Sequence, residues 1–151
     1  MNRYVLDPLI VELRHSADEK YRIFNEGLTP GAEGRSLGVR MHVLRKIAKG
    51  ILKDSPAHFL DASLSSGIHE LNLLHTIVLA SMPCEFPERL RRLKAFVPTI
   101  NNWAVCDLLC NDLRIDSQHL PAFKEFLEPY IHSEREFEVR FGLVMLMYRY
   151  D

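Results

Sequence analysis

The chain has 151 residues, a length typical of one domain, and we expect a single domain over residues 1–151. Its composition, 47% hydrophobic and 26% charged, is close to the globular average, which excludes collagen-like and mainly disordered chains. The formal net charge of -1 points to no nucleic-acid or membrane partner, so any such binding requires a local patch of charge.

Apolar residues recur at helical spacing along almost the whole chain, and no segment alternates as a half-buried strand does. This pattern predicts an all-α protein. The clearest apolar stripe consists of Leu44, Ile47, Ala48, Ile51 and Leu52. In chain order, the predicted helices cover residues 6–24, 41–52, 68–79, 90–97, 103–113, 123–131 and 137–148. Four glycines and Pro30 predict a flexible loop at about 27–38.

Three prolines mark a regularity in the second part of the chain. Pro56, Pro87 and Pro121 each stand where a helix can begin, and a second, more apolar helix follows each of them. A helix pair that recurs about every 30 to 35 residues is typical of an α-solenoid. We therefore predict an α-solenoid of antiparallel helix pairs.

The last predicted helix carries an apolar stripe that runs almost to the terminus at Asp151, with no glycine to end it. Its members are Phe137, Phe141, Val144, Met145 and Tyr148. Two explanations are open, because solenoids cover such a face. Either the array continues and the fold is truncated here, or the face docks on another subunit and the protein self-associates.

The three cysteines, Cys84, Cys106 and Cys110, predict reduced thiols and a cytoplasmic location, because a chain of this size needs no disulfides. Cys106 and Cys110 lie one helical turn apart, but no second ligand pair accompanies them, so we interpret both as core residues. Charged residues and Pro8 interrupt the N-terminal apolar residues, which predicts no signal peptide and no membrane partner.

Common motifs for metal, nucleotide and cofactor binding are absent from the sequence, so we expect no metal and no cofactor. The seven histidines are scattered, and we interpret them as solvated or hydrogen-bonded residues.

Trp103 and Asp107 stand at positions i and i+4 of one predicted helix and share a face, and the opposite side carries Val105, Leu108 and Leu109. They can point together into a groove. Alternatively, Asn102 caps the helix, Trp103 packs under the preceding loop and Asp107 pairs with a surface cation.

Arg140 precedes an almost wholly apolar stretch of the last helix. An arginine in such a place usually binds a carboxylate or a phosphate, because its five donors need acceptors. A pair with Glu136 one turn back is the simpler alternative.

Basic residues form stripes on two predicted helices, and such stripes are usually solvated faces. One stripe contains Arg45, Lys46, Lys49 and Lys53, and the other contains Arg89, Arg91, Arg92 and Lys94.

Three segments in order carry a family resemblance from about Gly38 to the end of the chain. Residues 37–40 read Leu-Gly-Val-Arg and lead into a basic helix, residues 102–107 read Asn-Trp-Ala-Val-Cys-Asp, and residues 137–141 read Phe-Glu-Val-Arg-Phe. Together they resemble the DNA alkylation repair glycosylase family, whose members consist of HEAT-like helical repeats.

The resemblance implies a glycosylase that excises cationic N3- and N7-alkylated purines from duplex DNA, with Trp103, Asp107 and Arg140 as its active-site cluster. We expect these three side chains to share one concave surface. The duplex-facing side should then carry Arg140 and part of the set Arg40, Arg45, Lys46, Lys49 and Arg92. The alternative is a non-catalytic HEAT-like module that binds nucleic acid or protein.

The sequence departs from the family pattern at two places, and it also ends earlier than longer relatives do. Met41 and His42 stand where many members have a residue and a proline, and a glycine-rich insertion precedes Gly38. Longer relatives add helices that complete the groove and supply a second aromatic residue. The 151-residue chain alone is therefore expected to be weakly active or inactive.

Overall fold

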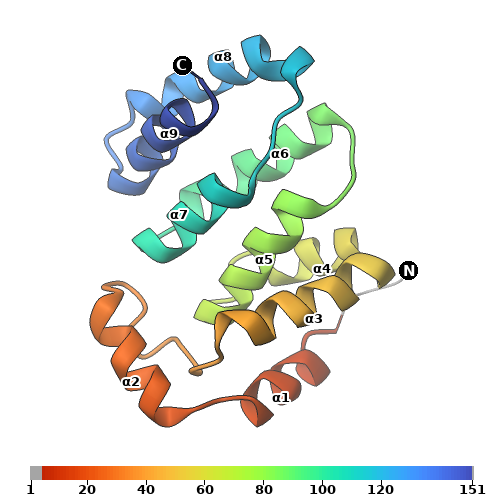
Figure 1. Cartoon of the computed structure of the whole chain (residues 1–151), viewed down its shortest axis with the longest axis vertical. Helices are drawn as coiled ribbons and strands as arrows, with labels where there is room; N and C mark the ends of the chain where they lie inside the picture. Colours follow the sequence, from red (N-terminus) through yellow and green to blue (C-terminus); the bar gives the residue numbers. More distant parts are fainter. Residues whose placement is uncertain (1–4, 151) are drawn as a thin grey trace. The chain divides into compact units, whose positions relative to one another are not determined.

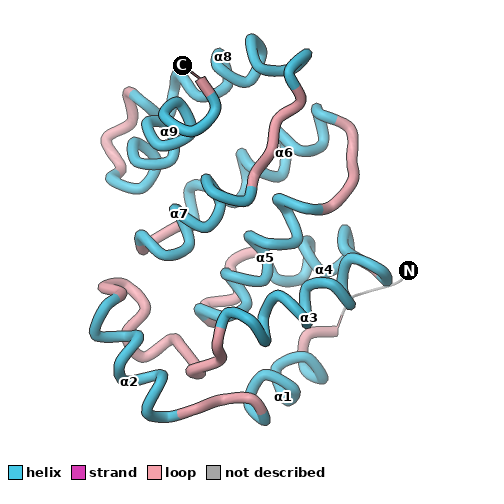
Figure 2. The backbone as a smooth tube through the Cα atoms, viewed as in Figure 1, coloured by secondary structure: helices cyan, strands magenta, loops and turns pink. Residues whose placement is uncertain are grey.

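The computed structural model describes residues 5–150, which fold into nine α-helices and two short 3₁₀ helices joined by loops (Figure 1). No β-strand occurs in this range, as the cyan helices and pink loops of Figure 2 show. The predicted all-α class is confirmed. The chain divides into two compact units, with the boundary between Met82 and Pro83. The single HEAT-like repeat domain over residues 1–151 stays a prediction.

The first unit contains helices α1 (Asp7–His15), α2 (Glu19–Leu28), α3 (Met41–Asp54), α4 (Pro56–Ser63) and α5 (His69–Ser81). The single helix predicted over residues 6–24 is wrong, because the chain breaks at residues 16–18. Asp18 has extended backbone angles, and its side chain accepts the backbone N–H of Tyr21 at 3.0 Å. This capping interaction starts a new helix within a run whose apolar spacing looks continuous.

Helix α5 forms the centre of the first unit and is buried on almost every side. Helix α3 packs against it with the predicted stripe, of which Leu44, Ala48 and Ile51 are buried, and α4 packs on it as well. Two buried polar side chains of α5 have local partners, whereas the buried Nδ1 atom of His69 has no hydrogen-bond partner within residues 5–150. The Nδ1 atom of His75 lies 2.8 Å from the Ser63 hydroxyl, and the Thr76 hydroxyl donates to the Asn72 carbonyl at 2.8 Å.

The loop before α3 is fastened to α5 by a buried carboxylate. Glu70 is only 2% exposed, and its oxygens accept the backbone N–H groups of Leu37, Gly38 and Val39 at 2.8, 2.9 and 3.2 Å. Gly38 has a φ angle of 86°, and a Cβ atom there would lie 2.5 Å from the Asp18 carbonyl oxygen. The glycine of the Gly-Val-Arg sequence at residues 38–40 is therefore required by the backbone conformation and by the close approach of Asp18.

We expect Gly38→Ala to lower the free energy of unfolding by about 2 kcal/mol or more, because it adds both backbone strain and a clash with the backbone. Gly50→Ala is the matched control. Gly50 lies inside α3 with open space around its Cβ position, so alanine there should raise stability by about 0.5–1 kcal/mol. Urea denaturation of both variants measures the two effects, and effects of the same sign would contradict the interpretation.

The second unit contains α6 (Phe86–Phe96), η1 (Val97–Thr99), α7 (Trp103–Asp112), η2 (Ser117–His119), α8 (Leu120–Ile131) and α9 (Glu136–Arg149). Pro56, Pro87 and Pro121 each lie in the first turn of a helix, which confirms the predicted helix starts.

Helix α9 packs against both α7 and α8 in the second unit. The inner part of its apolar stripe is therefore covered, since Phe141 and Met145 are fully buried. The Phe141 ring packs edge-on against the Tyr130 ring, with 5.3 Å between the ring centroids. This differs from the exposed stripe expected from the sequence. The large apolar residues that α9 exposes are Leu143, Met147 and Tyr148. Self-association through this helix stays a prediction.

Candidate functional site

The start of α7 is fixed by Asn102. This residue is buried, and its side-chain oxygen accepts the backbone N–H of Val105 at 3.0 Å. The capping role considered for Asn102 in the sequence is confirmed. It makes Trp103 the first residue of the helix and sets the direction of every side chain that follows.

Trp103 and Asp107 lie on the outer face of α7, whose inner face buries Val105, Cys106, Leu109 and Cys110. Trp103 is 42% exposed, so it is not fully packed under the preceding loop. The Asp107 side chain is 31% exposed. An indole and a carboxylate thus face solvent one helical turn apart.

Arg140 of α9 binds Asp107 through two parallel hydrogen bonds. Its Nε and Nη2 atoms donate to the two carboxylate oxygens, both at 2.7 Å. The alternative pair between Arg140 and Glu136 is therefore wrong. The hydrogen bonds to Asp107 raise the pKa of Arg140, and the partial burial of the guanidinium opposes them. The structure thus brings together two of the three predicted active-site residues, and their catalytic role stays a prediction.

The pair with Asp107 leaves the Nη1–Nη2 edge of the Arg140 guanidinium unused. Its side chain is 44% exposed, and only Nε and one N–H of Nη2 are used by Asp107. The three N–H groups that remain make no hydrogen bond to any residue in the described range 5–150. This edge can bind a further anion while the inner edge continues to hold the carboxylate.

The register between α7 and α9 places Asp107 opposite Arg140. The thiols of Cys106 and Cys110 point at the carbonyls of Phe137 and Phe141, with S···O distances of 3.7 and 3.8 Å. Both pairs are 31 residues apart, so the two helices run parallel, one predicted period apart. Both thiols are fully buried, which confirms the interpretation of these cysteines as core residues.

Arg149 is a positioning residue that the sequence analysis missed. From the end of α9 it donates to the carbonyls of Cys110 and Leu113 at 2.8 and 2.9 Å, and so closes the C-terminal end of α7. A basic residue in the last turn of a helix often binds the final carbonyls of that same helix, but the carbonyls that Arg149 binds belong to another helix. Only the fold reveals that partner.

The predicted DNA-contacting cations are distributed over both units. Arg45, Lys46 and Lys49 are exposed on α3. In the same unit, Arg40 pairs with Asp18 at 3.3 Å and lies over the Tyr21 ring. In the second unit, Arg92 is only 10% exposed and pairs with Glu88 at 3.1 Å. Arg92 is therefore the least accessible of the set, and the DNA-binding role of all these residues stays a prediction.

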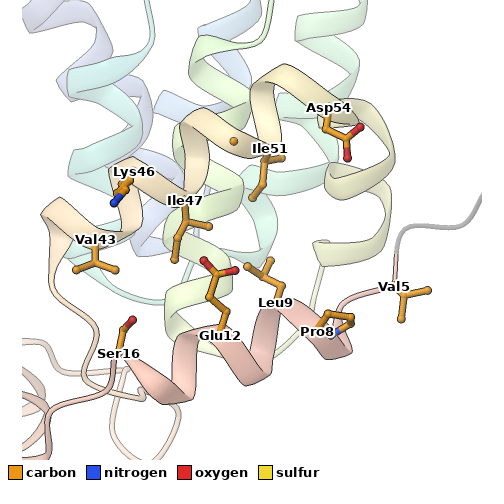
Figure 3. A pocket seen from close by; sticks show the side chains of 11 residues that line it. Val5, Pro8, Leu9, Glu12, Ser16, Val43, Lys46, Ile47, Ile51 and Asp54 are labelled. Atoms are coloured by element: carbon orange, nitrogen blue, oxygen red, sulfur yellow. The ribbon is translucent and has the colours of Figure 1, made fainter.

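The first unit has a cavity of about 530 Å³ between α1 and α3 (Figure 3). Its wall is mainly apolar, with Leu9 and Ile51 among its lining residues, and Glu12 and Lys46 also face it. None of the three predicted active-site residues contributes to this wall.

Two further structural observations apply to residues 5–150. The side chains of His, Cys, Asp and Glu in this range form no group of three or more placed to bind a metal ion. No helix in the same range combines the length and the apolar character required to cross a membrane.

Comparison with known proteins identifies one family. A family model described as DNA alkylation repair enzyme matches residues 10–151, which is nearly the whole chain. No curated protein matches the chain, and no solved structure does. The match covers both units and every predicted site residue.

Proposed function

The chain belongs to the DNA alkylation repair enzyme family, and we propose that it is a glycosylase that excises cationic N3- and N7-alkylated purines from duplex DNA. Membership of the family indicates repair of alkylated DNA. The observation that carries the finer proposal is the solvent-facing pair of Asp107 and Arg140 beside an exposed Trp103.

The side chains of this site support the proposed substrate class. An alkylated purine already carries a positive charge, so its departure as a leaving group needs little help from an acid. The bond between the base and C1′ breaks, a water oxygen bonds to C1′, and the water proton is released. Asp107 can stabilise the positive charge that develops on the sugar and can orient the attacking water.

Arg140 gives this carboxylate a fixed position. Two hydrogen bonds of 2.7 Å hold both Asp107 oxygens, and the free edge of the same guanidinium is available to a backbone phosphate. A phosphate bound there would lie at the neighbouring edge of the guanidinium, which shares Nη2 with the edge that holds Asp107. One side chain can thus connect the position of the DNA backbone to that of the catalytic carboxylate.

Trp103 supplies the third element of the proposed site. Its ring is 42% exposed at the first position of α7, one turn before Asp107. The face of an indole attracts cations, so the ring can lie against the deoxyribose and stabilise the charge that develops there. The exposure of the ring leaves it accessible for stacking on a substrate.

The alternative function is a non-catalytic helical-repeat module that binds nucleic acid or protein. The Asp107–Arg140 pair is also compatible with that alternative, because a carboxylate held by two hydrogen bonds can serve structure alone. The proposed site of action is the cytoplasm, where the three free thiols of Cys84, Cys106 and Cys110 would stay reduced.

Mass spectrometry of the reaction products tests the proposal. The product of the complete reading frame is incubated with duplex DNA that carries N7-methylguanine. A glycosylase releases free 7-methylguanine and leaves an abasic site. Oxidative removal of the methyl group would leave intact guanine, and methyl transfer would add the methyl mass to the protein. Either of those two products would contradict the glycosylase proposal, and DNA without any change would support the non-catalytic module.

Duplex affinity should fall steeply as salt rises. A chain with a net charge of -1 can hold a duplex only where its cations are concentrated, and each neutralised phosphate contributes about -0.9 to the slope of log K against log salt. We expect a slope of about -3 to -5, which corresponds to a few phosphate contacts. Fluorescence anisotropy at several KCl concentrations measures the slope, and an affinity that does not respond to salt would exclude a nucleic-acid interface.

A further inference from the structure

We propose that the second unit contains a phosphate-binding cavity between the start of α6 and the segment that follows α7. The cavity has a volume of about 210 Å³, and Arg89, Arg114 and His119 are among its lining residues. Trp103, Asp107 and Arg140 do not line it. The cavity is therefore a second site, and its occupation does not depend on the reaction proposed above.

Positive charge gathers at this end of α7. Arg89 lies in the first turn of α6, and Arg114 follows the end of α7. The Arg114 side chain has no ion pair or hydrogen bond to any described residue. Arg149 adds a third cation nearby, and its hydrogen bonds within residues 5–150 go to backbone carbonyls alone.

The pKa of Arg149 reflects this accumulation of charge. Burial lowers the pKa of its guanidinium, and the positive charge of Arg114 lowers it further. Like charges this close repel each other unless an anion lies between or beside them. A bound phosphate would relieve that repulsion and accept hydrogen bonds from the exposed Arg114 side chain.

Two carboxylates limit the charge of the ligand. Glu85 and Asp116 also line the cavity, and their two negative charges balance the two positive charges of Arg89 and Arg114. The excess positive charge comes from Arg149, which is outside the lining. This favours a phosphate group with one or two negative charges over a polyphosphate, which the carboxylates would repel.

The remaining lining groups are compatible with an anion. The His119 ring stacks on Phe86, with 4.2 Å between ring centroids and 2° between planes, so the imidazole is held in place and can donate one N–H. Burial raises the pKa of the Cys84 thiol, so this side chain stays uncharged at neutral pH. The volume is below that of typical drug-sized sites and suits a single phosphate group with its ester substituents.

Protection of Cys84 from alkylation tests the proposal. Cys84 is partly exposed, whereas Cys106 and Cys110 are buried, so iodoacetamide should label the cavity selectively, as peptide mass spectrometry can verify. Inorganic phosphate should slow the labelling of Cys84 about fivefold or more at saturation, and chloride at the same ionic strength should not. Equal labelling rates in phosphate and chloride would overturn the proposal.

Arginine variants show whether the protection requires this cavity. Arg114→Gln keeps most of the side-chain length, and we expect about tenfold weaker protection by phosphate. Arg91→Ala removes an exposed arginine of α6 that does not line the cavity. In this variant, phosphate should protect Cys84 as well as it does in the wild type. Arg89→Gln serves as a second variant if Arg114→Gln changes the circular dichroism spectrum. Protection that is equal in all variants would also overturn the proposal.

A short duplex without lesions identifies the source of the phosphate. If the duplex protects Cys84 in the wild type and in Asp107→Asn, the cavity binds the DNA backbone. If inorganic phosphate protects and the duplex does not, the ligand is a free phosphate or a small phosphorylated molecule. Both outcomes support a phosphate cavity, and neither depends on glycosylase activity.

Discussion

Replacement of Asp107 by asparagine should lower the rate of N7-methylguanine release by a factor of about 10² to 10³. The amide is nearly the same size and can still accept one hydrogen bond from Arg140, so the local structure should persist. It removes the negative charge that would stabilise the developing cation on the sugar. Duplex affinity should be unchanged or slightly higher, because a negative charge near the phosphates is lost.

Single-turnover kinetics and anisotropy on the same duplex measure the two effects separately. Asp112→Asn is the matched control, since it makes the same change at the last residue of α7 and should leave both quantities near the wild-type values. If Asp107→Asn releases the base as fast as the wild type, Asp107 has no catalytic role. The ion pair would then serve structure alone.

Arg140→Ala should weaken binding and catalysis together. It removes a proposed phosphate contact and also leaves the Asp107 carboxylate without the two hydrogen bonds that fix it. We expect duplex affinity to fall about tenfold and the slope against salt to become shallower by about 1. The release rate at saturating protein should fall by about 10², because the carboxylate is no longer positioned.

Arg140→Lys separates charge from geometry. Lysine keeps the positive charge but cannot form two parallel hydrogen bonds with a carboxylate, so it should restore most of the affinity and little of the release rate. Arg135→Ala is the control, because Arg135 is an exposed arginine at the start of α9 that pairs with Glu138 instead. Loss of affinity in Arg135→Ala equal to that in Arg140→Ala would contradict the specific role of Arg140.

The helices were predictable from the sequence because apolar spacing reports which side of a helix is buried. The stripe through Leu44, Ala48 and Ile51 lies in the core of the first unit as its spacing indicates. The break at residues 16–18 was missed for a local reason. Asp18 caps α2 through one hydrogen bond, and apolar spacing contains no information about that bond.

The site was only partly predictable. The shared face of Trp103 and Asp107 follows from their spacing on one helix. The partner of Arg140 did not follow, because Asp107 lies 33 residues away and Glu136, one turn back, was the simpler candidate. That choice depends on the parallel packing of α7 and α9, which Arg149 and the two buried thiols support.

Interactions between distant loops and helices were not predictable at all. Gly38 was recognised as a break in the helical pattern, but its partner Glu70 lies 32 residues further along the chain. Similarly, the proposed phosphate cavity combines Arg89 with Arg114 from separate segments. Neither segment contains a binding motif, so only the fold brings these cations to one cavity.

The central claim is that the protein cleaves the bond between an alkylated purine and its sugar. The most direct measurement is the single-turnover release of free 7-methylguanine from a duplex with one lesion, with the product of the complete reading frame in excess. We expect release well above the rate of spontaneous base loss in a reaction without protein. A release rate equal to the spontaneous rate would contradict the glycosylase function.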